Sequence, residues 1–422
     1  MFRPGGKRVF PAPFAVFPGS VFDPRTGKDL DQVVVATYFR PASFTGEDLA
    51  EITTHGNPVI IASILAILFQ EGARGAEPGE FIRRAFLNGK MDLLEIEAVA
   101  HMLSAVTASK VQIALQQLDG LPSRTIRRLR ERLLDYLTQI EAGLNFPEEA
   151  IEDIDEAVFK TELEHLISEL ERFHEAARQG DLISGGLRLV LVGRPNVGKS
   201  SVLNAILGRN RAIVTEIPGT TRDTLEETFS IAGFPVKLID TAGLRPSSDR
   251  LEQLGIDRTR KALSEAFLAL VILDTSEPIS QEDREVVQSV QDSGKPFLLV
   301  FNKSDLALKW RPEESFPLMR GVSLSTHTGD GLDRLSERVA EKIQVQGHLH
   351  LEELVFLGAQ QLSSLAQALS GLQTIHAQLG QLFHDLLAVE LEDAIRHLGR
   401  VTGETVDIGT LDRIFERFCI GK

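Results

Sequence analysis

The sequence contains a single cysteine, Cys419, among 422 residues. One cysteine cannot form an internal disulfide, which excludes a disulfide-stapled secreted domain and is typical of a reducing compartment. No run of 18 or more apolar residues occurs, so we expect no membrane-spanning helix. The first residues, MFRPGGKRVFPAPF, also lack the apolar segment of a signal peptide. We therefore expect a cytoplasmic protein.

Basic residues are fewer than acidic residues in this chain. The chain has 45 Lys and Arg against 60 Asp and Glu, which gives a net charge of −15. A protein that coats nucleic acid needs clustered positive charge to neutralise phosphates, so this class is excluded and any RNA contact must be confined to one face. The main basic stretch, 123–133, places Arg124, Arg127 and Arg128 on one side of a predicted helix. Phosphate contact and a solvated helix face are both open interpretations of it.

Four segments of the chain differ in their hydrophobic pattern. Residues 1–88 mix β-like runs with one apolar helical stretch, which predicts a small α+β domain. Residues 89–185 are helical in pattern, and this pattern returns at 346–422. Residues 186–345 alternate short apolar runs with helical stretches, as βαβ units on a parallel sheet do. We predict a multidomain protein in which a Ras-like α/β domain is inserted into a helical domain, after an N-terminal α+β domain.

A phosphate-binding motif stands at the start of the inserted domain. GRPNVGKSS (193–201) matches G-x-x-x-x-G-K-[ST] and lies between a predicted strand and a predicted helix, as the motif requires. Glycines allow the backbone N–H groups to turn toward phosphate oxygens. Lys199 would reach the β- and γ-phosphates, and Ser200 would offer its hydroxyl to Mg²⁺. The predicted nucleotide contacts in this loop are Asn196, Val197, Gly198, Lys199, Ser200 and Ser201.

Later motifs identify the base as guanine. NKSD (302–305) follows a predicted strand, and Asp305 can accept two hydrogen bonds from the N1–H and N2 amine of guanine, which adenine cannot supply. DTAG (240–243) places an aspartate near Mg²⁺ and a glycine near the γ-phosphate, and LSTHTGDG (324–331) would complete the base pocket. The predicted contacts are Asp240, Thr241, Ala242, Gly243, Asn302, Lys303, Ser304, Asp305, Ser325, Thr326 and His327.

The residue that orients the attacking water is not evident from these motifs. Ras-like enzymes carry glutamine directly after D-x-x-G, whereas this chain has Leu244, which cannot orient water. Arg194, Arg222 and Arg245 lie nearby in sequence, but sequence alone does not say where they point. A hydrolase that uses another polar residue and a non-catalytic nucleotide switch are both open. A ribosome-assembly GTPase is a third alternative, although the helical residues after 346 show no RNA-binding module.

The order of several motifs resembles the MnmE (TrmE) family of tRNA-modification GTPases over nearly the whole chain. The most specific of them are GEFIRRAFLNGK (79–90) and the terminal FCIGK (418–422); SFTGEDLAEITTHGNP, NFPEE, GTTRD and DTAGLR also fit in order. The resemblance implies a homodimer whose GTPase domains pair head to head, with potassium in place of an arginine finger. It also implies that tRNA and an MnmG-like, FAD-dependent partner take part in adding a carboxymethylaminomethyl-type group to carbon five of wobble uridine.

The resemblance assigns roles residue by residue. Glu252 matches the glutamate that acts on the attacking water, although without the resemblance it would be assigned to an exposed helix face. Lys199 and Cys419 match the other catalytic positions. The potassium positions are Asn196, Thr215, Ile217 and Thr220, the magnesium positions are Ser200 and Thr221, and Thr215, Thr220 and Thr221 count among the nucleotide-site residues.

The resemblance further implies that the N-terminal domain binds 5-formyltetrahydrofolate. Glu51, Lys90 and Lys422 match contacts to this folate, although each would otherwise be taken for a surface charge. Members of the family begin with a Gly-rich turn and a strand that carries a folate-contacting arginine, and MFRPGGKRVF reproduces neither. We therefore expect the first strand of this domain to be missing.

Cys419 has three interpretations. The motif C-a-a-X places a prenylated cysteine fourth from the end, but Lys422 is outside the usual terminal residues, which argues against a lipid anchor. A small packed side chain is the commonest fate of a free cysteine. The resemblance instead points to help in the modification chemistry, with Lys422 favouring the thiolate. The second and third interpretations stay open.

Overall fold

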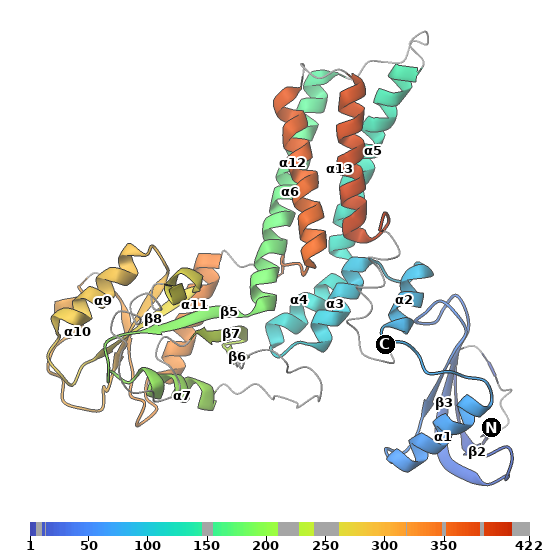
Figure 1. Ribbon diagram of the computed structural model, residues 1–422, viewed down its shortest axis with the longest axis horizontal. Helices are drawn as coiled ribbons and strands as arrows, with labels where there is room; N and C mark the ends of the chain where they lie inside the picture. Colours follow the sequence, from blue (N-terminus) through green and yellow to red (C-terminus); the bar gives the residue numbers. More distant parts are fainter. Residues whose placement is uncertain are drawn as a thin grey trace.

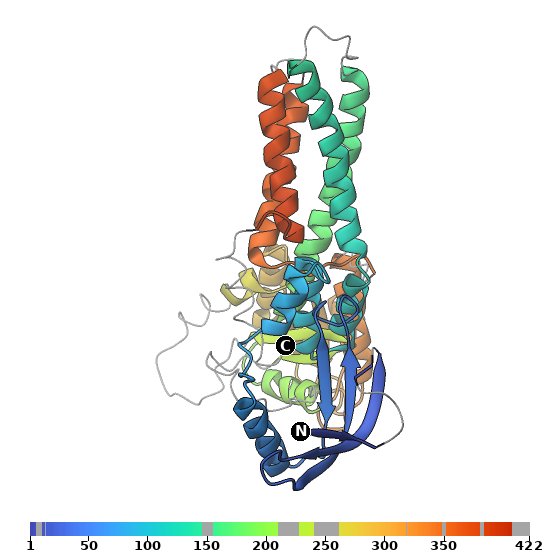
Figure 2. The same ribbon diagram turned by 90° about the vertical axis from the view of Figure 1, so that its right-hand side faces the viewer.

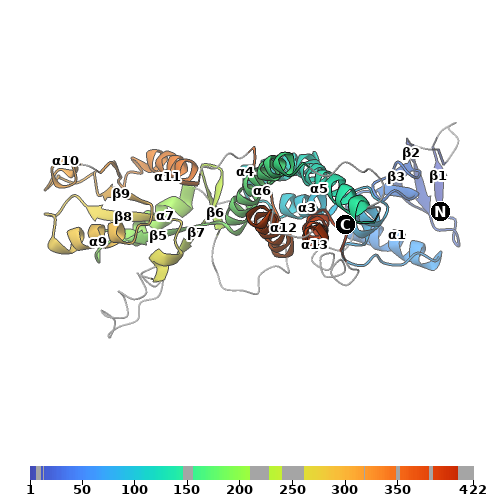
Figure 3. The same ribbon diagram turned by 90° about the horizontal axis from the view of Figure 1, so that it is seen from above.

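The computed structural model describes residues 1–5, 11–12, 14–145, 155–209, 228–239, 261–317, 319–347, 352–379 and 384–406. Its three parts follow one another along the long axis of the molecule, with a helical bundle between a mixed sheet and an antiparallel sheet (Figures 1 and 3). The chain leaves the bundle, forms the mixed sheet and returns to the bundle. The predicted fold class, with a Ras-like α/β domain inserted into a helical domain, is therefore confirmed.

The N-terminal part is a four-stranded antiparallel sheet covered by one helix. The sheet order is β1-β2-β3-β4. Alternate residues of β3, Val33 and Val35, point inward and pack with Val21 and Ile64. The elements are β1 (Phe2–Pro4), β2 (Ala15–Phe22), β3 (Asp29–Tyr38), β4 (Leu49–Thr53) and α1 (Pro58–Gln70).

Four long helices form the upright bundle in Figures 1 and 2. Apolar residues recur at helical spacing on their inner faces, for example Leu129, Leu133 and Leu137 of α5, and make one buried core. Among the described helices, none is both long and apolar enough to cross a membrane. The bundle helices are α5 (Leu121–Asn145), α6 (Glu156–Gly185), α12 (Ala359–Gln378) and α13 (His384–Thr402), and the shorter helices at its base are α2 (Glu80–Leu87), α3 (Leu93–Leu103) and α4 (Ala108–Leu118).

The arginines of the basic stretch hold helix α5 to its neighbours. Each of the five guanidinium groups between residues 123 and 133 has a protein acceptor, so the interpretation that this stretch contacts phosphates loses support. The pairs are Arg124 with the Asp119 carbonyl, Arg127 with Asp92 and Glu404, Arg128 with Glu169, Arg130 with Glu404, and Arg132 with Glu162.

The inserted domain is a six-stranded sheet in the order β10-β9-β8-β5-β7-β6. Its central strands are mostly apolar, and all seven residues of β8 are buried, as a sheet covered on both faces requires. The elements are β5 (Leu187–Val192), α7 (Lys199–Arg209), β6 (Thr228–Ile231), β7 (Phe234–Ile239), β8 (Leu268–Asp274), α9 (Gln281–Asp292), β9 (Phe297–Asn302), α10 (Pro312–Ser315), β10 (Gly321–Ser323) and α11 (Leu332–Gly347).

One pair of strands departs from the parallel sheet that the sequence predicts. Strand β6 runs antiparallel to β7, whereas the other neighbouring pairs are parallel. The two strands are joined by Ala232 and Gly233, whose φ angles are 48° and 89°. A two-residue turn with positive φ at both positions matches the twist of a tight hairpin.

Helix α4 joins the bundle to the inserted domain. Its Ser109 hydroxyl donates to the carbonyl of Gly233 in the β6–β7 turn, at 2.5 Å. Its Lys110 ammonium donates to the carbonyl of Ser184, near the end of α6, at 3.1 Å. Ile113 of α4 is buried in the same core as the β5 and β7 strands. One short helix therefore contacts both the exit from the bundle and the sheet.

Candidate nucleotide-binding site

The phosphate-binding motif forms the turn between β5 and α7, as its spacing predicts. Gly193 has a φ of 156°, and a Cβ at this position would lie 2.5 Å from the Ile272 carbonyl oxygen. Gly198 has a φ of 96°, and a Cβ there would lie 2.3 Å from Nδ2 of Asn302. Any larger residue would clash with β8 or with the NKSD motif, so both positions need glycine.

Some side chains of this loop are buried and hold it to the core, and others are exposed to solvent. Val197 is fully buried and fixes the loop in the core. Lys199 directs its ammonium back over the loop, 2.8 Å from the carbonyl oxygens of both Gly193 and Arg194. Asn196 adopts a φ of 64° and is exposed, and Ser200 is exposed in the first turn of α7. Because backbone N–H groups at a helix N-terminus attract anions, the loop is suited to phosphate.

The NKSD motif touches the phosphate loop directly. Asn302, which is almost fully buried at the end of β9, donates from Nδ2 to the Val197 carbonyl at 2.9 Å. Three residues later, Asp305 is exposed and accepts a hydrogen bond of 2.6 Å from the Ser325 hydroxyl, which lowers the pKa of the Asp305 carboxyl. The predicted phosphate and base motifs therefore lie in one site, with a carboxylate at its exposed edge.

The loop after β10 completes this arrangement. Ser325 is buried, and its hydroxyl also accepts from the backbone N–H of His327 at 3.2 Å. Ser304 donates its N–H to the Leu324 carbonyl at 3.1 Å, so this loop and the NKSD motif are joined by backbone and side-chain bonds. His327 is exposed and Thr326 is half-buried beside it.

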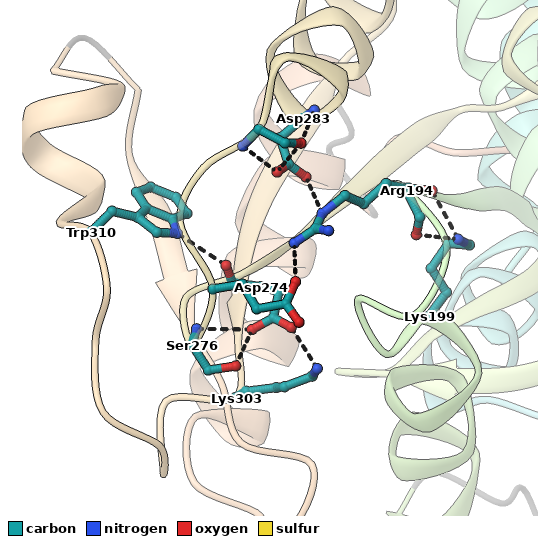
Figure 4. A network of polar contacts seen from close by, with 10 residues as sticks. Arg194, Lys199, Asp274, Ser276, Asp283, Lys303 and Trp310 are labelled. Atoms are coloured by element: carbon teal, nitrogen blue, oxygen red, sulfur yellow. Dashed lines mark hydrogen bonds and ion pairs between the residues drawn. The ribbon is translucent and has the colours of Figure 1, made fainter.

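Arg194 forms ion pairs with two acidic side chains, Glu277 and Asp283. Its guanidinium donates to Oδ1 of Asp283 at 3.1 Å and to Oε2 of Glu277 at 2.8 Å (Figure 4). The Glu277 carboxylate raises the pKa of this already basic group. Asp283 is buried in the first turn of α9, where its carboxylate also accepts from the backbone N–H of the N-cap residue Ser280 at 3.0 Å. Arg194 thereby links the phosphate loop to α9.

Comparison with known proteins identifies the family. The profile described as the MnmE helical domain matches residues 93–419, and that of the GTP-binding protein TrmE N-terminus matches residues 4–90. The tRNA modification GTPase MnmE of Natranaerobius thermophilus is 40% identical over 411 residues, covering 96% of this chain and 89% of that protein. The chain belongs to the MnmE family of tRNA modification GTPases.

Other relatives agree with this assignment. The MnmE protein of Moorella thermoacetica is 41% identical over 413 residues, with 96% of this chain and 88% of that protein covered. Among solved structures, the G domain of the T. maritima FeoB iron transporter is 28% identical, with a TM-score of 0.29; the match covers 37% of this chain and 99% of that one. The assignment to the MnmE family rests on the sequence relatives and profiles.

Several residues that the GTPase motifs or the MnmE resemblance single out lie outside the described part of the chain. They include the switch and water-positioning candidates and the two candidates of the FCIGK motif, so their roles stay predictions. These residues are Thr215, Ile217, Thr220, Thr221, Asp240, Thr241, Ala242, Gly243, Leu244, Glu252, Cys419 and Lys422.

The two described folate candidates lie on separate elements of the N-terminal part. Glu51, on β4, accepts a hydrogen bond from the Tyr38 hydroxyl at 3.3 Å, and its charge raises the pKa of Tyr38. Lys90 is exposed after α2, with its stem beside Gly46. Both side chains are accessible from solvent, which a ligand contact requires.

The MnmE-specific stretch 79–90 contains an ion-pair cluster that sequence patterns did not reveal. Glu80 accepts from Arg74 and from Arg84, both at 2.6 Å, and Arg84 also reaches Glu47 at 2.8 Å. The hydrogen bond from Arg74 is the main cause that lowers the pKa of Glu80 to about 2. This part of the motif ties α2 to the loops before it.

Asp274 lies beside the NKSD motif and pairs with Lys303, although no motif includes it. It ends the buried strand β8, beside the NKSD motif at the end of β9. An acid at the carboxyl end of a buried parallel strand was the available signal, because ligands of such sheets bind at that edge.

Proposed function

We propose that this chain hydrolyses GTP as part of the modification of wobble uridine in tRNA, with potassium stimulating the reaction. The observation that carries the nucleotide assignment is the 2.9 Å hydrogen bond from Asn302 to Val197, which joins the base motif to the phosphate loop. Asp305 then stands as the acceptor for the guanine N1–H and N2 amine. Membership of the MnmE family supplies the link to tRNA modification.

Two described residues of the phosphate-binding motif, Lys199 and Ser200, fit the phosphates and the Mg²⁺ of a guanine nucleotide. The phosphate loop presents Ser200 at the start of α7, where Mg²⁺ would be held together with Thr221 and Asp240. When bound, the cations would offset the negative charge on the phosphate oxygens. The chain itself contributes Lys199 and the helix N-terminus to the same end.

The contacts of Arg194, the described arginine within the phosphate-binding motif, support the potassium proposal. Arg194 pairs with Glu277 and Asp283, so its guanidinium is not placed to act as an arginine finger. Asn196 is exposed on the outer turn of the phosphate loop, and its amide oxygen would be one ligand of a monovalent cation. Thr215, Ile217 and Thr220 are the proposed remaining contributors, and pairing of two GTPase domains would close the site.

The potassium proposal is tested by measuring GTP turnover in KCl and in NaCl at high protein concentration, where domains can pair. We expect a faster rate in KCl for the wild type and equal rates in both salts for Asn196→Ala. Asn204→Ala is the matched control, because Asn204 is an exposed asparagine further along α7, and it should keep the preference for KCl. Equal wild-type rates in the two salts would contradict the proposal.

Glu252 is the proposed residue that positions the attacking water, since Leu244 cannot do so. Replacing Glu252 by Ala should slow single-turnover hydrolysis and leave the Kd for GDP unchanged. An unaltered rate would remove Glu252 from the mechanism.

The finer role in tRNA is also a proposal. The chain would act as a homodimer with an MnmG-like, FAD-dependent partner to place a carboxymethylaminomethyl-type group on carbon five of the wobble uridine. A folate such as 5-formyltetrahydrofolate would bind near Glu51, Lys90 and Lys422, and Cys419 would lie near it. Mass spectrometry of wobble uridines in cells that lack the protein is the direct test, and a normal modification level would contradict the proposal. The cytoplasmic location stays a prediction.

A further inference from the structure

Lys303 of the NKSD motif combines an unusual backbone conformation with a partly buried ion pair. Its φ is 63°, a region that residues with a Cβ seldom adopt. Its ammonium lies 2.5 Å from Oδ2 of Asp274. The Lys303 side chain is 31% exposed, whereas that of Asp274 is only 2% exposed. The charged end of the lysine is therefore anchored inward.

Asp274 is itself fixed from several directions (Figure 4). Its Oδ1 accepts from the backbone N–H of Ser276 at 2.9 Å and from the Ser276 hydroxyl at 2.6 Å. Its backbone carbonyl accepts from Nε1 of Trp310 at 3.0 Å. Burial opposes ionisation of Asp274, but the hydrogen bonds from Lys303 and Ser276 outweigh it, so its pKa lies below the usual value. One carboxylate oxygen is thus used to hold the loop, and the other is left for Lys303.

The segments that carry this pair are also joined along their backbones. The N–H and the hydroxyl of Thr275 both donate to the carbonyl of Asn302, at 3.2 and 2.9 Å. Lys309 donates its N–H to the Thr275 carbonyl at 2.9 Å. These bonds fix the two strand ends without the Asp274–Lys303 pair. The pair is therefore not needed to bring the strands together, and its effect falls on the position of the Lys303 side chain.

We propose that Asp274 is a positioning residue for the guanine nucleotide: it fixes the Lys303 ammonium and thereby holds the hydrocarbon stem of Lys303 as a rigid apolar edge of the base pocket. The stem runs from the backbone between Asn302 and Asp305, the two ends of the base motif, to a buried anchor. A lysine that is held in this way loses little side-chain entropy when a ligand packs against it, whereas a free lysine loses more. This inference rests on the proposed function of the site as a guanine-nucleotide pocket.

The test is a double-mutant cycle on the full chain, with Kd values for GDP measured by calorimetry. Asp274→Asn keeps the shape of the side chain and removes its charge, and Lys303→Met keeps an apolar stem and removes the ammonium. We expect each change to weaken GDP binding about tenfold, as the loss of a charged hydrogen bond does. The double variant should bind about as well as either single variant, because each change breaks the same pair.

A second readout separates positioning from a general loss of structure. When the rate is measured over a range of GTP concentrations, Asp274→Asn should raise KM while kcat stays within about twofold. The reason is that the lost contact stabilises the bound substrate and the transition state equally. Asp292→Asn is the matched control, because Asp292 is an exposed carboxylate at the far end of α9, and its Kd for GDP should equal that of the wild type. If Asp274→Asn does not fold, Asp274→Glu, which keeps the charge but displaces it, takes its place in the cycle.

The outcomes are distinct. The positioning role would be overturned if the fold-increases in the Kd for GDP of the two single variants multiply in the double variant, or if Asp274→Asn leaves this Kd unchanged. Either result would leave the GTPase assignment intact. A wild-type chain that binds GDP no better than ADP would instead overturn the proposed function.

Discussion

Gln117 makes the hydrogen bonds that fasten the returning chain to the base of the bundle, and its replacement has a calculable effect. Gln117 lies on α4 and is 1% exposed. Its Nε2 donates to the carbonyls of Leu94 and Phe356 at 2.6 and 2.9 Å, and its Oε1 accepts from the Phe356 N–H at 2.8 Å. Gln117→Met keeps nearly the same volume but leaves three buried backbone groups without these partners. At about 1 kcal/mol for each lost bond, we expect a local loss of roughly 3 kcal/mol.

A local probe is needed because a chain of several domains does not unfold in one step. Hydrogen exchange of the peptide that contains Phe356 reports on opening at this place. A loss of roughly 3 kcal/mol should speed exchange of the Phe356 amide by about 100-fold. Gln112→Met is the matched control, since Gln112 is exposed on the same helix. An exchange rate for Gln117→Met within threefold of the wild type would refute the reasoning.

Two further predictions concern residues near the bundle and the phosphate loop. His101, which lies against Phe356, has its pKa lowered to about 4, chiefly because burial opposes its charging and also because Lys110 repels the proton. Since its unfolded pKa is about 6.5, stability should fall by roughly 2 kcal/mol between pH 7 and pH 5 from this group. Hydrogen-exchange protection of the Phe356 amide, corrected for the intrinsic exchange rate, should depend less on pH in His101→Gln than in the wild type, and an equal dependence would contradict the assignment. Arg194→Gln should lower kcat in KCl by less than about tenfold, since an arginine finger is worth about 10³-fold or more. A loss on that larger scale in steady-state turnover would mean that Arg194 does reach the phosphates.

The part of the site that sequence predicts well is local in the chain. The phosphate loop is predictable because its motif is contiguous in the sequence, is flanked by a strand and a helix, and places glycines at the two positions with φ angles of 156° and 96°. The NKSD and LSTHTGDG motifs each follow the end of a parallel strand, and the NKSD motif contacts the phosphate loop and the LSTHTGDG loop. The helices of the bundle follow from apolar residues that recur at helical spacing.

What sequence did not predict depends on contacts between distant residues. Gln117 and Phe356 are 239 positions apart, and neither carries a motif. The pairing of Arg194 with Asp283 is decided by the approach of α9 to the phosphate loop, which spacing does not encode. The hairpin of β6 and β7 was missed because it is formed by a two-residue turn, Ala232–Gly233, within a segment assigned to a parallel sheet. The basic stretch on α5 was ambiguous for the same reason, since its acidic partners lie on other helices.

The central claim is that Asp305 makes this pocket selective for guanine. Its most direct test is calorimetric titration of the full chain with GDP and with ADP. Two hydrogen bonds to a charged acceptor predict that GDP binds at least about 100-fold more tightly than ADP, and that Asp305→Ala removes most of this difference. Equal Kd values for GDP and ADP in the wild-type chain would contradict the account.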